Sequence, residues 1–360
     1  MESEWYDKPG PLRKGEKPDM TGLSQYLASH LPGWGGDAAV SQFPRGYSNL
    51  TYMISSGGRE YVLRRPPYGA NVKSGHDMAR EFRVLSGLEK VYPKVPRPIL
   101  FCDDREIIGA PFYLMERVEG VILRAGMSEE MYPDSALMRK IAESLAGSLS
   151  ELHEVDYAAA GLEDLGRPEG YVARQVSGWA DRYMKAKTDE VPQMEAAARW
   201  LADHMPKVSG VSLIHNDFKY DNVVLDPGDW SEIKAVLDWE MATVGDPLMD
   251  LGTSLGYWMD PGDPPQMLAL KLSPTTLPGN PSRAEFAELY AQKSGRDVGQ
   301  LLFYYVYGLF KVGVIVQQIY WRYRMGHTGD VRFANLIEAV RGCGQMAALA
   351  IEKKRIDQLF

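Results

Sequence analysis

The stretch from residue 212 to residue 240 restricts the fold of this chain more than any other part of its sequence. Two short apolar runs, at residues 212–214 and 223–225, flank a polar loop. A third apolar run, at residues 235–237, ends at Asp238. Short apolar runs between polar turns are typical of buried strands. Rigid elements of this kind can direct an Asp, an Asn and a second Asp at one volume.

The polar residues of this stretch match the groups that phosphoryl transfer requires, namely a positioned hydroxyl, a metal ion and compensating positive charge. Asp217 can accept or orient the proton of the acceptor hydroxyl. Asn222 and Asp238 offer the oxygen ligands that Mg²⁺ prefers. Lys219 can place its ammonium near the transferred phosphoryl group, and His215 is interpreted as a scaffold for the loop backbone.

This spacing resembles that of the kinase-like superfamily, and specifically the aminoglycoside phosphotransferase (choline kinase-like) family. The family pattern, His-x-Asp-x₄-Asn followed by an Asp at a strand end, is met by His215, Asp217, Asn222 and Asp238. Alone the loop would be a weak signal, because Asp and Asn also populate turns for conformational reasons. The phrase at residues 237–252 also looks like the family's continuation, in which Asp250 would brace the catalytic loop.

The resemblance implies an α+β, bilobal, protein-kinase-like fold with ATP and Mg²⁺ as cofactors. The N-lobe would be a small antiparallel sheet with one inserted helix, and the larger C-lobe would be mainly helical. We expect a flexible segment at residues 1–18, an N-lobe that clamps the nucleotide at residues 19–117, and a C-lobe at residues 118–360. The C-lobe would contain the catalytic loop, the metal site and the acceptor pocket.

Local patterns agree with one change along the chain from strands to helices. Strands are predicted at residues 42–55, 59–64 and 111–118, with a hairpin turn at residues 56–58 and an inserted helix at residues 76–88. Helices are predicted at residues 135–154, 170–187 and 194–204, and from residue 301 onward. Residues 301–321 contain a single charge, Lys311, so this segment is either a buried core helix, which we favour, or a membrane span.

The nucleotide clamp has to be built without a P-loop or a Rossmann fingerprint, because the sequence contains neither. Arg64 is preferred to Arg65 as the phosphate-binding cation because it shares a strand face with Val62. The resemblance to kinases implies that Glu81 pairs with Arg64 and that backbone groups near Glu116 and Val118 bind adenine. The residues predicted to bind nucleotide are Gly46, Ser48, Asn49, Val62, Arg64, Glu81, Glu116 and Val118.

Composition narrows the classes of partner. The formal net charge of −8 argues against nucleic acid or an anionic membrane as the main partner. Two cysteines, Cys102 and Cys343, have no zinc-ligand spacing, and no apolar signal-peptide core opens the chain, so we expect a cytoplasmic protein. The oligomeric state stays open.

The acceptor is expected to be a small molecule. Asp238 is followed by Trp239 and only eleven residues separate it from Asp250, which leaves no room for a peptide-docking activation segment. The sequence looks closest to the subgroup similar to kinase-like domains fused to acyl-CoA dehydrogenases, which implies a hydroxyacyl or hydroxyacyl-CoA acceptor. The alternatives are an aminoglycoside or other antibiotic as acceptor, and a nucleotide-binding pseudokinase that serves as an interaction module. Whether ATP or GTP is preferred stays open.

Overall fold

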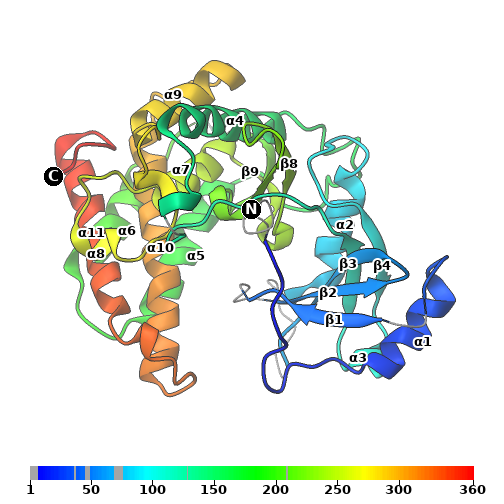
Figure 1. Ribbon diagram of the computed structural model, residues 1–360. Helices are drawn as coiled ribbons and strands as arrows, with labels where there is room; N and C mark the ends of the chain where they lie inside the picture. The colour runs from blue at the N-terminus through cyan, green and yellow to red at the C-terminus, as the bar shows by residue number, and fades with distance from the viewer. Residues whose placement is uncertain (1–6, 36–37, 45–48, 69–75, 128, 208–209) are drawn as a thin grey trace.

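Strands dominate the first third of the chain and helices dominate the rest, which divides the structure into two lobes (Figure 1). The structure is a computed structural model that describes residues 7–35, 38–44, 49–68, 76–127, 129–207 and 210–360. In Figure 1 the N-lobe is blue to cyan, and the C-lobe runs from green to red. The segment that follows β5 (Phe112–Glu116) connects the two lobes.

The N-lobe is built on a five-stranded antiparallel sheet with the strand order β1-β2-β3-β5-β4. The other strands are β1 (Ala39–Gln42), β2 (Leu50–Ser56), β3 (Arg59–Arg65) and β4 (Pro98–Cys102). Gly57 and Gly58 connect β2 to β3 with φ angles of 57° and 73°. Positive φ at both central residues is what the two-residue hairpin turn requires, so the predicted hairpin is confirmed.

The two faces of this sheet are covered by different parts of the protein, because alternate side chains of a strand point to opposite faces. Leu63 packs in a cluster with helix α1 (Met20–His30) and with the short helix α3 (Arg105–Ile108). Val62 instead joins the larger cluster that includes helix α2 (Met78–Leu88) and the C-lobe core. The face that carries Val62 is therefore the one next to the C-lobe.

The C-lobe is mainly helical, as predicted. Its α-helices are α4 (Ser135–His153), α5 (Tyr171–Ala186), α6 (Pro192–Asp203), α7 (Pro247–Tyr257), α8 (Pro265–Leu268), α9 (Arg283–Ser294), α10 (Leu301–Arg324) and α11 (Leu336–Lys353). Its short 3₁₀-helices are η3 (Glu129–Met131), η4 (Tyr220–Asn222), η5 (Trp239–Met241), η6 (Pro274–Thr276) and η7 (Val331–Phe333). Two antiparallel pairs complete it, β6 (Ser212–Ile214) with β9 (Thr243–Gly245), and β7 (Val223–Leu225) with β8 (Ile233–Val236).

Helix α10, orange in Figure 1, is the central helix of the C-lobe and packs against α5, α6, α7 and α11. It is long and apolar enough to cross a membrane by length and composition, and 78% of its most apolar window is buried inside the lobe. The crossing with α7 is close, since a Cβ added to Gly308 would lie 1.9 Å from the carbonyl oxygen of Gly252. Only glycine permits this approach, and it brings Asp250 of α7 and Lys311 of α10 to the same region.

The helices predicted at 135–154, 170–187 and 194–204 match α4, α5 and α6 to within two residues at each end. The single strand predicted at 42–55 is wrong, because β1 ends at Gln42 and β2 begins at Leu50. Pro44 has no N–H to donate to a strand ladder, which explains the interruption. Helices α1 and α3 and strand β4 have no counterpart among the predictions. Gly10 forms an isolated bridge with Gln42 at the edge of the sheet.

Candidate active site

The site is assembled by the β7–β8 hairpin, whose antiparallel pairing sets Val223 opposite Val236. One step further along, the Leu237 N–H donates to the Asn222 carbonyl over 2.7 Å. Asn222 therefore comes just before β7, and Asp238 just after β8, at the same end of the hairpin. The pairing of β7 with β8 therefore brings together two residues that are far apart in the sequence.

Asp217 is the centre of the predicted catalytic loop, which runs from β6 to β7. Its carboxylate forms an ion pair with the Lys219 ammonium. The side-chain amide nitrogen of Asn222 donates to the Asp217 carboxylate over 2.9 Å and to the Asp217 carbonyl over 2.8 Å. Because the nitrogen of Asn222 faces Asp217, its amide oxygen is the atom available to a cation. The structure thus brings Asp217, Lys219 and Asn222 together.

His215 is a buried, neutral support for the loop. Its Nε2 donates to the Leu237 carbonyl over 2.9 Å, so its Nδ1 is the acceptor for the Asp217 N–H at 3.2 Å. Burial lowers the pKa of His215 more than Asp250 and Asp217 raise it, which agrees with the neutral ring. The bond from Nε2 ties the catalytic loop to the residue that precedes Asp238.

Asp250, which the resemblance assigned to bracing the loop, lies at the first turn of α7 and is fully buried. Its carboxylate accepts from the N–H groups of His215 and Asn216 over 2.6 and 2.7 Å, and from His153 Nε2 over 3.2 Å. Burial acts to raise the pKa of Asp250, but the contacts with His153 and His215 outweigh it and lower the pKa. His153 is a member of this site that the sequence analysis did not identify.

Arg64 connects the two lobes. Its guanidinium lies 2.9 Å from the Glu81 carboxylate on α2, 2.9 Å from Asp238 and 3.4 Å from Glu240. Burial acts to raise the pKa of Asp238, but Arg64 outweighs it and the pKa is lowered. Asp238 has the left-handed backbone conformation, with φ of 68°, and precedes the 3₁₀-helix η5. Glu240 was not assigned a role from sequence, although its position two residues after Asp238 could have indicated one.

Two of the other predicted clamp residues, Asn49 and Val62, lie on the same side of the sheet as Arg64. The Asn49 side-chain nitrogen donates to the Glu240 carboxylate over 2.7 Å, which places Asn49 against the residues after Asp238. Val62 is buried and sits opposite Met115 in the β3–β5 pair. Gly46 and Ser48 lie outside the described residues.

The linker between the lobes begins at Glu116, whose N–H donates to the Arg97 carbonyl over 2.9 Å. The Glu116 carboxylate also contacts Arg97, at 3.1 Å. Val118 packs in a small apolar cluster with Ile122, Val224, Ala235 and Leu237. The linker is thus anchored on the hairpin that carries Asn222 and Asp238.

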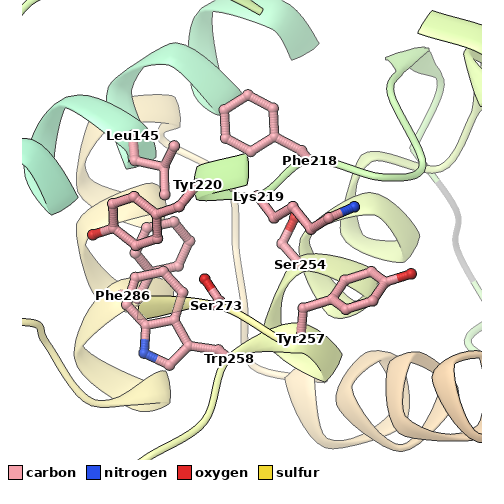
Figure 2. Close-up of a pocket in the computed structure, with 9 residues that line it drawn as sticks. All are labelled: Leu145, Phe218, Lys219, Tyr220, Ser254, Tyr257, Trp258, Ser273 and Phe286. Carbon is pink, nitrogen blue, oxygen red and sulfur yellow. The ribbon is translucent and has the colours of Figure 1, made fainter. Parts of the chain in front are cut away.

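Lys219 of the loop between β6 and β7 lies next to Tyr257, the last residue of α7. In Figure 2 the Lys219 ammonium and the Tyr257 hydroxyl both point away from the aromatic group formed by Tyr220, Trp258 and Phe286. The ammonium lies 4.8 Å from the centre of the Tyr257 ring. Burial, followed by the Asp217 carboxylate, raises the pKa of Tyr257 well above its ordinary value. The cavity in Figure 2 measures about 10 Å³, which is room for about one water molecule and no larger ligand.

The oxygen atoms that Asp238 and Asn222 offer at this site fit a magnesium ion. Mg²⁺ is commonly held by one or two protein oxygen ligands together with substrate phosphates and water. Asp238 supplies a carboxylate with its pKa held low, and Asn222 supplies an amide oxygen from the adjacent end of the hairpin. Within the described part of the chain, no cluster of three or more His, Cys, Asp or Glu side chains offers a denser protein-only metal site.

Comparisons with known proteins agree with this geometry. The phosphotransferase enzyme family model matches residues 39–286. Rat acyl-CoA dehydrogenase family member 11 is 36% identical over 320 residues, which is 87% of this chain and 40% of the rat protein. The crystal structure of a candidate aminoglycoside phosphotransferase from Ralstonia eutropha is 29% identical, with a TM-score of 0.78 over 94% of this chain and 99% of that one. A ternary complex of an aminoglycoside phosphotransferase APH(4)-Ia mutant with AMP-PNP and hygromycin B shares the fold at 17% identity, with a TM-score of 0.56 over 89% of this chain and 98% of that one.

The two lobes and the site define a phosphotransferase of the protein-kinase-like fold. The chain belongs to the phosphotransferase enzyme family. The predicted resemblance to kinase-like domains of acyl-CoA dehydrogenases is confirmed, and the chain spans about two fifths of the length of the rat relative.

Proposed function

We propose that this protein transfers the γ-phosphate of ATP, with Mg²⁺, to a hydroxyl of a hydroxyacyl compound, including hydroxyacyl-CoA. The observation that carries the proposal is the convergence of Asp217, Asn222 and Asp238 at one end of the β7–β8 hairpin. A base, two oxygen ligands and adjacent cations at one place are the recurring parts of phosphoryl transfer.

In the proposed reaction the oxygen of the acceptor hydroxyl attacks the γ-phosphorus. The bond from that phosphorus to the bridging oxygen of ADP breaks, and the hydroxyl proton passes to the Asp217 carboxylate. Lys219, which pairs with Asp217, stabilises the negative charge on the transferred group. Bound at Asn222 and Asp238, Mg²⁺ would neutralise charge on the phosphates of ATP.

The nucleotide would occupy the face of the N-lobe sheet that carries Val62 and Arg64. Arg64 has its place fixed by Glu81, so it would meet the phosphates with little further ordering. At the linker the Glu116 N–H is already bonded to Arg97, which leaves the Glu116 carbonyl and the Val118 backbone as the groups proposed to bind adenine.

The acceptor class proposed here is that of hydroxyacyl compounds, including hydroxyacyl-CoA. The name of the rat relative, an acyl-CoA dehydrogenase family member, supports the same class.

An ATP-consumption screen tests the proposal. Purified protein with Mg²⁺ is offered hydroxyacyl-CoAs, hydroxyacids, amino alcohols, sugars and aminoglycosides, and phosphorylated product is detected by mass spectrometry. We expect turnover with a hydroxyacyl compound, and a loss of about 10²- to 10⁴-fold in kcat for Asp217→Asn. Turnover with aminoglycosides alone would overturn the acceptor class. Binding of ATP without any turnover would instead support the alternative of a nucleotide-binding pseudokinase.

A further inference from the structure

Lys311 lies in the middle of α10 and is 1% exposed. Burial of an ammonium is unfavourable unless the group is paired or hydrogen-bonded, so a buried lysine is expected to have defined partners. Burial lowers the pKa of Lys311 to about 8; Asp217 and Asp250 oppose this effect, and Lys219 and Arg182 add to it. The ammonium therefore needs defined polar partners in the centre of the C-lobe.

The partner of Lys311 is the catalytic loop. Its ammonium donates to the Asn216 carbonyl over 2.8 Å and lies 3.5 Å from the Asn216 side-chain oxygen. The same peptide unit continues into the Asp217 N–H, which donates to His215 Nδ1 over 3.2 Å. Lys311 and His215 thus hold the two ends of the peptide that precedes the Asp217 side chain.

Asn216 needs this support because its backbone has φ of 67°, in the left-handed region that non-glycine residues rarely adopt. Its N–H is bound by Asp250 over 2.7 Å, and its side-chain nitrogen donates to the Met241 carbonyl over 3.2 Å. The Lys311 bond to the carbonyl completes this set. The close Gly252–Gly308 contact between α7 and α10 is what brings Asp250 and Lys311 to the same residue.

We propose that Lys311 is a positioning residue for phosphoryl transfer, which fixes the Asn216–Asp217 peptide from α10 and so orients the Asp217 carboxylate toward the acceptor hydroxyl. The inference rests on the proposed function, in which Asp217 receives the proton. It adds a residue that lies far from the catalytic loop in sequence. A small displacement of a catalytic group can lower a rate by about 100-fold.

Lys311→Met is the test variant, and Gln317→Met is the matched control. Gln317 is also buried on α10 and donates to a backbone carbonyl, but that carbonyl belongs to Ala186 at the end of α5, not to the catalytic loop. We expect Lys311→Met to lower kcat by about 10- to 100-fold with an unchanged KM for ATP, and to speed amide exchange across residues 213–222. Gln317→Met should lose comparable stability while keeping kcat, and Lys311→Arg, which keeps a cationic donor, should recover much of the rate.

The outcomes separate this inference from the proposed function. If the wild-type protein turns over no acceptor, the proposed function fails, and amide exchange still tests the link between Lys311 and the loop. Unchanged exchange across residues 213–222 in Lys311→Met, or an unchanged kcat, would overturn the inference. Should Lys311→Met not fold, the shorter neutral variant Lys311→Gln is expected to give the same loss of kcat. Failure of both to fold would assign Lys311 to folding alone and overturn the positioning role.

Discussion

Replacing Arg64 with methionine should destabilise the protein strongly, because Arg64 is the counter-charge for a buried group of carboxylates. Glu81 has a side chain 1% exposed and contacts Arg64 at 2.9 Å, whereas Asp238 and Glu240 have side chains 34% and 13% exposed. Methionine has a similar length and no charge, so the substitution leaves the Glu81 carboxylate buried without a cation.

The buried charge of Glu81 determines how much unfolding free energy Arg64→Met should lose. Removal of one partner from a buried ion pair lowers the free energy of unfolding by about 3–5 kcal/mol. Asp238 contributes less to this loss, because its partial exposure lets water replace part of the lost interaction. We therefore expect a loss of about 3–4 kcal/mol for Arg64→Met, and recovery of about half of it in the double variant Arg64→Met/Glu81→Gln, which removes the buried charge.

The loss of stability in Arg64→Met should also depend on pH. Burial already raises the pKa of Glu81 against the opposing effect of Arg64, so removal of Arg64 raises it further. A carboxyl whose pKa is higher in the folded than in the unfolded state binds protons more tightly when folded, so stability falls as pH rises through that range. Arg64→Met should thus regain stability at about pH 5.5 relative to about pH 7.5, and the double variant should not.

Urea denaturation followed by tryptophan fluorescence measures these free energies. Arg97→Met is the surface control: its pair with Glu116 has side chains 59% and 51% exposed, and its removal should change stability by less than about 1 kcal/mol. A loss below about 1 kcal/mol for Arg64→Met, or no recovery in the double variant, would refute the description of Arg64 as the cation of a buried network.

Three further predictions concern the site. Asp238→Ala should abolish Mg²⁺-dependent ATP binding, which isothermal titration calorimetry would detect; retained Mg²⁺-dependent binding would remove Asp238 from the metal site. Lys219→Met should lower kcat by about 10- to 1,000-fold with little change in the KM for ATP, and a purely raised acceptor KM would contradict a role in the transition state. Asp250→Asn should lower stability by about 2–4 kcal/mol at neutral pH. Because the folded pKa of Asp250 is lowered, its contribution is present above the unfolded pKa and lost as pH falls, so the variant should show a shallower acid transition than the wild type by circular dichroism.

Much of the local structure could be predicted from the sequence. The two-glycine turn defined the β2–β3 hairpin, and the apolar periodicity of residues 135–154 defined α4. Helix α1 was not predicted because only Leu23 and Leu27 are buried on it, which leaves a weak periodic pattern. Strand alternation favoured Arg64 over Arg65, and the pair with Glu81 that the family resemblance implied is present in the structure.

The family and the set Asp217, Asn222 and Asp238 could be predicted from the sequence, because spacing within one loop and the next strand end is a local property of the chain. Which distant residues meet them depends on the tertiary structure. Lys311 reaches Asn216 from α10, and Glu240 is held by Asn49 and Arg64 of the other lobe. Contacts of this kind depend on how helices cross and how lobes close, which one-dimensional spacing does not encode. The close α7–α10 packing is the physical reason that the only charge in residues 301–321 lies beneath the catalytic loop.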